Sequence, residues 1–486
     1  MADSLKNKTV KGVAWSLTDN LANQGITFLV GLVLARLLTP TEYGVIGIIM
    51  IFIAVFNSIV DSGFSSALIR KTNTTHTDYN TVFLFNIVLS ILLYVVIYIG
   101  APAIAHFFNN DSLIILTRVM GIVVIINGLG LIQKTILTKN IDFKTQTKIS
   151  CISSITSGIV GIVMAVKDFG VWSLVAQQIS RQILFTIFLW IYSREWFPRF
   201  EFSIQSFKQL FSFGSKVLVV GLIHTIWEEI YQFVIGKCYS PATLGQFTRA
   251  NQFRTIFSRN FASVIQRVSY PVLSSIENDP ERLRDGFRRI VKVTTLIAFT
   301  CMLGLGAASY QVILVLIGEK WLIAASFLQI ICFSGMLNPQ QMLNNNLLQV
   351  QGKSGLLLRL EIVKRIFAAI PVLFGIFINI EWMLWGSVFT NLLCLCLSGF
   401  YAGKAIHYSL SDQFKDVLPA FLIALFMGGV VWAISFISWT NYLLLPVQII
   451  SGGIVVISLC ELFKLEEYYE IKHIALSLKE KISYGK

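Results

Sequence analysis

Long apolar runs follow one another along almost the whole chain, and they constrain its fold more than any other feature. A helix needs roughly 20 mostly apolar residues to cross the hydrocarbon of a bilayer. The runs have that length, and none alternates with the period of two that a membrane barrel requires. We therefore predict an all-α polytopic membrane protein with about 14 spans, at 12–38, 42–66, 80–106, 113–138, 145–166, 170–193, 208–236, 243–270, 288–316, 321–350, 355–380, 382–404, 416–438 and 441–463.

The composition excludes most other classes of protein. Apolar residues make up 55% of the 486 residues, and charged residues only 13%. Soluble domains carry about 25% charged residues, so a globular surface of this size could not be kept hydrated. A soluble enzyme, a disordered chain and a fibrous protein are excluded. The five histidines and seven cysteines are scattered without metal-ligand spacing, so we expect neither a metal nor a cofactor.

The distribution of cations predicts the orientation in the membrane. The formal net charge is +13, from 39 Lys and Arg against 26 Asp and Glu. Cytoplasmic loops of membrane proteins carry an excess of Lys and Arg. Most of these cations fall in loops and tails on the side of the membrane that holds the N-terminus. They include the cations at 134–148, 282–292 and 353–365, the last including Lys364. We therefore predict a multi-pass plasma-membrane protein with both termini in the cytoplasm, and no nucleic-acid partner.

A short motif occurs twice and indicates an internal duplication. "LLTPTEYG" contains Pro40 and Gly44, and "CYSPATLG" contains Pro241 and Gly245. Each copy lies between two apolar runs, and the six spans between the copies give the two halves the same orientation. We predict two pseudo-symmetric six-helix lobes and an additional pair of helices. The boundaries are 1–193 for the N-terminal lobe, 194–207 for an interfacial linker, 208–404 for the C-terminal lobe, 405–463 for the helix pair and 464–486 for a cytoplasmic tail.

Arginines mark the span predicted at 243–270 as a candidate binding surface. Ionisable side chains at membrane depth are costly, so they face a cavity or a partner. Four arginines of this span extend over about 27 Å, close to the hydrocarbon thickness. A guanidinium group grips phosphate through two parallel hydrogen bonds and stays charged. We predict that an anionic substrate contacts Arg249, Arg254, Arg259 and Arg267, together with Arg118 and Arg181 on the fourth and sixth spans.

Other polar side chains are predicted to line the same cavity, and structural alternatives remain open for both sets. The polar set comprises Asp19, Asn23, Asp61, His224, Glu228, Glu229, Asn338, Gln341 and Asn345. Two roles remain open for the acids and His224. They can couple transport to H⁺ or Na⁺, or they can form hydrogen bonds between helices. Arg249 and Arg267 can reach the membrane interfaces, and Arg254 or Arg259 can pair with Glu228 or Glu229. The charged segment 277–290 is interpreted as a solvated hairpin, with contact to anionic lipid as its alternative.

Several segments resemble those of a known transporter family. "GVAWSLTDNLANQGITFLVGLVLARLLTPTEYGVIGI" with "DSGFSSALIRK" downstream resembles the start of bacterial polysaccharide exporters. These are the Wzx-type flippases of the multidrug/oligosaccharidyl-lipid/polysaccharide (MOP) exporter superfamily, in the branch associated with colanic and teichuronic acids. In the second half "FKQLFSFG", "VIGKCYSPATLGQFTRANQ" and "YPVLSSIENDPERLRDGFRRI" are similar to the same family.

The resemblance implies a function in surface polysaccharide biosynthesis, such as that of lipopolysaccharide or capsule. An undecaprenyl-diphosphate-linked oligosaccharide would pass from the cytoplasmic to the outer leaflet of the bacterial plasma membrane, by alternating access of two lobes around a cationic cavity. The partners expected are this lipid-linked oligosaccharide, membrane lipids and the polymerase machinery, and the transporter is expected to act as a monomer.

Two other classes of function remain as alternatives. A multidrug exporter of the MATE type would carry organic cations, and the excess of arginines disfavours it. A membrane polysaccharide polymerase or ligase needs a large external loop with catalytic side chains. The loops predicted here are short, so this enzyme class is also disfavoured.

Overall fold

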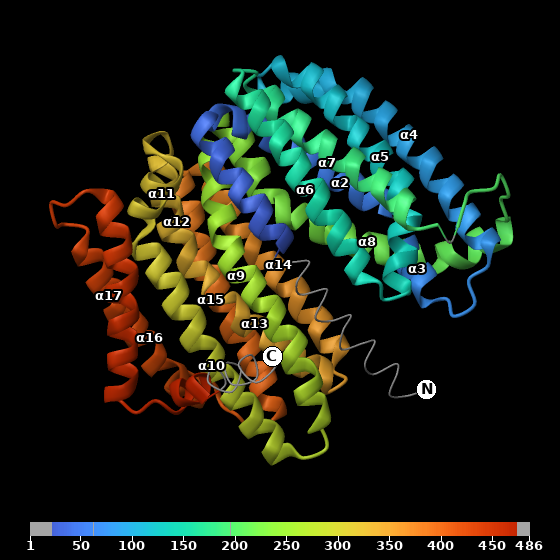
Figure 1. The fold of residues 1–486 in the computed structure, drawn as a ribbon. Helices are drawn as coiled ribbons and strands as arrows, with labels where there is room; N and C mark the ends of the chain where they lie inside the picture. Colours follow the sequence, from blue (N-terminus) through green and yellow to red (C-terminus); the bar gives the residue numbers. More distant parts are fainter. Residues whose placement is uncertain (1–21, 62, 195, 474–486) are drawn as a thin grey trace, which may run out of the picture. The chain divides into compact units, whose positions relative to one another are not determined.

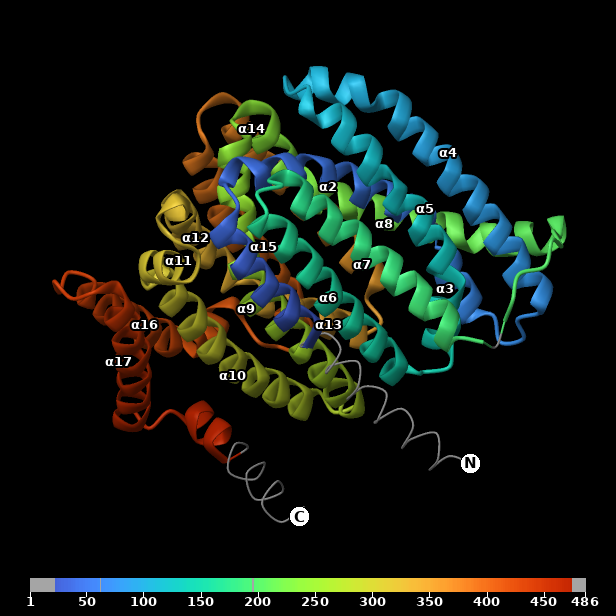
Figure 2. The same ribbon diagram turned by 45° about the horizontal axis from the view of Figure 1, so that its top comes forward.

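The computed structural model describes residues 22–61, 63–194 and 196–473, which form helices joined by short connections (Figures 1 and 2). These residues contain no strand, which confirms the all-α prediction. A helix at Ala22–Leu37 comes first. It is followed by α2 (Pro40–Asp61), α3 (Phe64–Arg70), α4 (His76–Phe108), α5 (Ser112–Lys139), α6 (Phe143–Val166), α7 (Val171–Tyr192), α8 (Ile204–Cys238), α9 (Pro241–Ser275), α10 (Pro280–Ala307), α11 (Ser309–Ile317), the 3₁₀ turn η1 (Glu319–Trp321), α12 (Leu322–Gly335), α13 (Asn338–Val350), α14 (Ser354–Phe377), α15 (Ile380–Ala405), α16 (Leu410–Ile434) and α17 (Asn441–Leu462).

The helices follow the predicted spans from the second span onward. The second predicted span extends over α2 and the start of α3, the ninth is divided into α10 and α11, and the tenth into α12 and α13. Of the first predicted span, residues 12–21 lie outside the described residues. Within the described residues, eleven helical segments are long and apolar enough to cross a membrane. The helices α9 and α14 are not among them, because charged residues interrupt their apolar surfaces. The number fourteen therefore stays a prediction.

The chain divides into two compact units, Met1–Thr248 and Arg249–Lys486. In the first unit, α4 packs along α5, α6 along α7, and α2 against α5 and α8. In the second unit, α10 packs along α16, α14 along α15, and α16 along α17 (Figures 1 and 2). The lobe boundaries expected from the repeat, 1–193 and 208–404, stay a prediction.

The two copies of the repeated motif meet inside the first unit. A Cβ atom placed on Gly44 would lie 1.6 Å from the carbonyl oxygen of Pro241, and one placed on Gly245 would lie 1.9 Å from the carbonyl oxygen of Pro40. Each glycine therefore lets the start of α2 and the start of α9 approach backbone to backbone. The contact between the two motif copies is reciprocal.

Buried charges hold the connection between α3 and α4. Asp78 is fully buried, forms an ion pair with Lys71 at 2.8 Å, and accepts a hydrogen bond from the backbone N–H of Thr75 at 2.9 Å. Lys139 Nζ, at the end of α5, donates to the carbonyl oxygen of Lys71 at 2.6 Å and to Thr74 Oγ1 at 2.7 Å. These bonds fix the start of α4 against the end of α5.

The segment between α7 and α8 is anchored by one aromatic side chain. Trp196 is buried, and its indole N–H donates to Asn80 Oδ1 of α4 at 3.1 Å. Phe200, in contrast, is 98% exposed. Aromatic side chains concentrate at membrane–water interfaces, and the interfacial linker expected at 194–207 stays a prediction. The helix that follows begins at Ile204.

Candidate functional site

The interior of the first unit holds an arginine bound to a neutral amide. Arg181 Nη2, on α7, donates to Asn23 Oδ1 at 3.2 Å, and Ser154 Oγ of α6 donates to the same oxygen at 2.7 Å. Two of the predicted site residues, Arg181 and Asn23, therefore lie together. Among the described residues, Arg181 forms no ion pair with a carboxylate.

A chain of amide side chains begins at the residue next to Arg181 on α7. Gln182 Nε2, the neighbour of Arg181 on α7, donates to Asn127 Oδ1 of α5 at 3.4 Å. Asn127 Nδ2 then donates to Asn57 Oδ1 of α2 at 3.1 Å. The prediction from sequence did not include Asn127 or Gln182 in the site. The signal that could have found them is an amide within each of two apolar spans, one of them adjacent to Arg181.

Arg118 of α5 donates a hydrogen bond to a backbone carbonyl of the neighbouring helix α4. Pro102 of α4 lacks an N–H group, so the carbonyl of Tyr98, four residues earlier, has no helical donor. Arg118 Nε of α5 donates to that oxygen at 3.3 Å, and the guanidinium carbon lies 4.3 Å from the centroid of the Tyr98 ring. This pair of contacts accounts for Arg118 without a substrate.

In the second unit, α9 brings arginines against polar partners. Arg254 donates to Asn251 Oδ1 through Nε at 3.0 Å and through Nη2 at 2.8 Å. A Cβ atom on Gly335 of α12 would lie 3.1 Å from Arg254 Cγ, so the side chain passes close to this helix. Arg249 is buried and donates to Gln252. The side chain of Arg259, like all of Asp19, lies outside the described residues.

The remaining predicted residues of α2, α8 and α9 occupy less enclosed positions. Arg267 is half-buried, and Asp61 is exposed at the end of α2. On α8, His224 and Glu228 are exposed, whereas Glu229 is half-buried and accepts a hydrogen bond from Gln232 Nε2 at 2.5 Å.

The amides predicted on the tenth span join three helices of the second unit. Asn338 Nδ2 of α13 lies 3.3 Å from Ser258 Oγ of α9, and Ser258 in turn donates to the carbonyl oxygen of Gly335 at 2.8 Å. Gln341 Nε2 donates to the carbonyl oxygen of Asn391 of α15 at 3.0 Å. The break between α12 and α13 is therefore held by side-chain hydrogen bonds.

Asn345 belongs to a charged cluster that the sequence analysis missed. Its amide nitrogen donates to Glu361 Oε1 at 3.3 Å, and its oxygen accepts from Lys364 Nζ at 3.2 Å. Lys364 also forms an ion pair with Glu361 at 2.9 Å and is only 8% exposed. Lys364, counted above with the cations of the loops, lies within α14 and is held by these two partners. The spacing of Glu361 and Lys364, three residues apart on one helical face, is the signal that could have found it.

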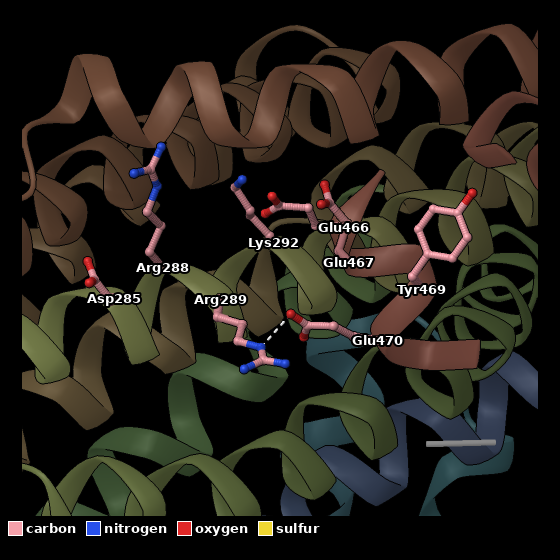
Figure 3. A pocket seen from close by; sticks show the side chains of 8 residues that line it. All are labelled: Asp285, Arg288, Arg289, Lys292, Glu466, Glu467, Tyr469 and Glu470. Carbon is pink, nitrogen blue, oxygen red and sulfur yellow. Dashed lines mark ion pairs between the residues drawn. The ribbon is translucent and has the colours of Figure 1, made fainter. Parts of the chain in front are cut away.

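A charged cavity of about 900 Å³ lies between the first turns of α10 and a helical segment at 466–473 (Figure 3). Arg288 binds Asp416 of α16 through two hydrogen bonds, and Arg289 forms an ion pair with Glu470. Tyr408 donates to Asp416 at 2.7 Å, and burial together with this bond raises the pKa of the Tyr408 hydroxyl above its usual value. The side chains that line the cavity are Asp285, Arg288, Arg289, Lys292, Glu466, Glu467, Tyr469 and Glu470.

The described residues contain no group of three or more His, Cys, Asp or Glu side chains that could hold a metal ion. The side chains described above carry guanidinium, ammonium, carboxylate and amide groups. Such groups bind oxyanions and sugar hydroxyls through hydrogen bonds.

Comparisons with known proteins identify a family and relatives of this chain. The model of a family described as "Polysaccharide biosynthesis protein" matches residues 33–326. The chain is 26% identical over 476 residues to the teichuronic acid biosynthesis protein TuaB of Bacillus subtilis (strain 168), covering 96% of this chain and 97% of that protein. It is 25% identical to the succinoglycan biosynthesis transport protein ExoT of Rhizobium meliloti (strain 1021), covering 70% of this chain and 69% of ExoT.

Solved structures share the fold. The lipid II flippase MurJ, in an inward closed conformation, gives a TM-score of 0.76 at 16% identity, covering 93% of this chain and 98% of MurJ. An inward-facing multidrug resistance MATE family transporter of the MOP superfamily gives a TM-score of 0.61 at 17% identity, covering 81% of this chain and 96% of the transporter. The chain therefore has the fold shared by MurJ and this MATE transporter, as the resemblance implied.

Proposed function

Because this chain belongs to the polysaccharide biosynthesis protein family, we propose that it transfers an undecaprenyl-diphosphate-linked oligosaccharide across the bacterial plasma membrane. Transfer runs from the cytoplasmic to the outer leaflet, and it supplies the assembly of a surface polysaccharide. The protein is then a transporter and not an enzyme. Its relatives include a protein named for succinoglycan transport, and its fold is shared with a lipid II flippase.

The observation that carries the proposal is the interaction of Arg181 with a neutral partner inside the first unit. Asn23 orients the guanidinium group through one hydrogen bond at 3.2 Å without neutralising its charge. A half-buried, positively charged group of this kind attracts an oxyanion more strongly than one in bulk water, because the surrounding dielectric is lower. A diphosphate group supplies that oxyanion, and the amides Asn57, Asn127 and Gln182 offer hydrogen bonds to sugar hydroxyls.

Arg181 also separates this proposal from drug export. The MATE-type transporter has the same fold, so the fold does not discriminate between the two functions. The guanidinium group of Arg181 would repel an organic cation, whereas it attracts an anionic passenger.

We extend the proposal to orientation and partners. Both termini lie in the cytoplasm, because the segments rich in Lys and Arg lie on that side. The protein resides in the bacterial inner membrane, acts as a monomer, and delivers its product to the polymerase machinery. Reorientation proceeds by alternating access, with H⁺ or Na⁺ as the coupling ion.

The substitution Arg181→Gln tests the proposal. Surface polysaccharide is quantified in a strain that lacks the chromosomal gene and expresses the variant, and lipid-linked oligosaccharide is quantified in its membranes. We expect export to fall by about tenfold or more, which corresponds to about 1.4 kcal/mol of lost interaction, while the lipid-linked precursor accumulates.

Two variants serve as controls for this test. Arg181→Lys keeps the positive charge and should retain part of the export. Arg118→Gln removes an arginine that contacts the backbone, so export should follow the amount of folded protein. Normal export by Arg181→Gln, at equal protein abundance, would contradict the proposal.

A further inference from the structure

Two cavities of the second unit meet at the ion pair between Arg289 and Glu470. The first is the charged cavity of about 900 Å³ described above. The second has a volume of about 750 Å³ and lies between α9, α10 and the segment 466–473. Arg289, Tyr469 and Glu470 line both cavities. Figure 3 shows Arg289 turned toward Glu470, and Arg288 turned away from it.

The second cavity is amphipathic. Its long walls are apolar, with Phe261 and Ile265 on α9 and Ile290, Val293 and Ile297 on α10. Polar groups from Arg289, Tyr469, Glu470 and His473 line its end toward the start of α10, and the hydroxyl-bearing Ser269 and Thr294 also belong to its lining. The apolar wall on α10 extends over about two helical turns, or roughly 11 Å. This arrangement fits a molecule with a hydrocarbon chain and a polar head.

The cations around the first cavity differ in how firmly they are held. Arg288 donates to both carboxylate oxygens of Asp416, and Lys292 lies 3.7 Å from the same group. Arg289 is bound by Glu470 alone among the ion pairs of the described residues, and its side chain is 68% exposed. An exposed ion pair contributes little net stability, so Arg289 can exchange Glu470 for another anion at low cost.

The segment 466–473 is fixed at its other side, so Glu470 has a defined position. The hydroxyl groups of Tyr468 and Tyr469 and the ammonium group of Lys472 donate to Glu461, at 3.2, 3.0 and 2.7 Å. Glu461 belongs to the last turn of α17. The segment is thus tied to α17 by three hydrogen bonds and to α10 by the ion pair.

We propose that these two cavities form a binding site for a phosphate-bearing lipid. The phosphate replaces Glu470 on Arg289, and the hydrocarbon chain lies along the apolar wall formed by α9 and α10. The phosphate can belong to a bilayer phospholipid or to an isoprenoid carrier, because both share this chemistry. This site goes beyond the transport proposal. It rests on that proposal only for its assignment to the cytoplasmic leaflet, which follows from the proposed orientation.

The test measures lipid binding to the purified full-length protein in a nonionic detergent, by native mass spectrometry. The probes are phosphatidylglycerol, an isoprenyl phosphate, the corresponding isoprenyl alcohol, and inorganic diphosphate. We expect both phosphate lipids to bind, and the alcohol and inorganic diphosphate to bind at least about tenfold more weakly. A preference between the two phosphate lipids identifies the source of the natural ligand.

Two substitutions with opposite expected effects make the site assignment specific. Arg289→Gln removes the phosphate contact and should weaken binding of the phosphate lipids by about tenfold. Glu470→Gln removes the competing carboxylate and should strengthen binding several-fold. Arg282→Gln is the matched control, because Arg282 is an exposed arginine of the same helix that pairs with Asp279 and lines neither cavity.

Three outcomes would overturn the proposal. They are unchanged binding in Arg289→Gln, weaker binding in Glu470→Gln, and equal binding of the alcohol and the phosphate. Thermal unfolding of each variant separates lost binding from lost folding. The assay involves no transport, so failure of this site and failure of the transport proposal are distinguishable.

Discussion

At the scale of single residues, a cation within an apolar helix bundle can have one of two roles. It can donate to a backbone carbonyl that lacks its helical partner, or it can bind a ligand. Arg118 illustrates the first case, since its donor replaces the N–H group that Pro102 lacks. Arg181 has a neutral amide oxygen as its partner, and we propose the second role for it. The sequence predicted the same role for both residues, because it shows which helix carries an arginine but not which acceptor that arginine meets.

The role of Arg118 predicts a coupling with Pro102. Arg118→Leu should lower the free energy of unfolding by about 1–2 kcal/mol, because the Tyr98 carbonyl is left without a donor. In a Pro102→Ala background the helix supplies its own N–H group to that carbonyl, so the same substitution should cost less. Thermal unfolding of the four proteins in detergent measures the difference. An equal cost in both backgrounds would contradict the assignment.

At the scale of elements, the repeated motif sets how α2 and the start of α9 approach each other. Gly44 faces the carbonyl oxygen of Pro241, and Gly245 faces that of Pro40, at separations that leave no room for a side chain. We predict that Gly44→Ala and Gly245→Ala each destabilise the protein by about 1–3 kcal/mol, because the obstructing atoms belong to the backbone and cannot rotate away.

The matched control is a helical glycine with open space around it. Gly100 of α4 would place a Cβ atom with no other atom within 4 Å, so Gly100→Ala should be neutral or slightly stabilising. The measurement is the thermal unfolding midpoint of the purified proteins, together with their abundance in the membrane. A similar midpoint for all three variants would rule out the reciprocal contact as a determinant of folding.

The elements were predicted well from sequence where apolar length alone defines them. The bounds of α4, α6 and α17 lie within a few residues of the predicted spans. The breaks between α10 and α11 and between α12 and α13 were not predicted, because the apolar runs continue across them. At the second break the deciding interaction is the hydrogen bond from Ser258 to Gly335, which joins residues distant in sequence. The cluster of Asn345, Glu361 and Lys364 escaped prediction for the same reason.

At the scale of the whole molecule, the orientation in the membrane connects the charge pattern with the proposed direction of transport. The predicted topology places most of the 39 Lys and Arg in loops on one side, and the proposed phosphate-lipid site includes Arg289 of the charged segment 282–292. If these loops are cytoplasmic, the site opens toward the leaflet in which the lipid-linked precursor is made. The orientation is therefore the premise shared by the direction of transport and the leaflet assigned to the lipid site.

Cysteine labelling in cells tests that premise directly. The exposed native cysteines Cys238 and Cys301 are first replaced by serine, and a single cysteine is then introduced as Asn110→Cys or Asn278→Cys. Asn110 lies between α4 and α5, and Asn278 lies between α9 and α10. A membrane-impermeant maleimide should label the first variant in intact cells, and the second only after permeabilisation. The odd number of predicted spans between the two positions requires this opposite result. Equal labelling would mean that a span is missing or added between them, and the leaflet assigned to Arg289 would then lose its basis.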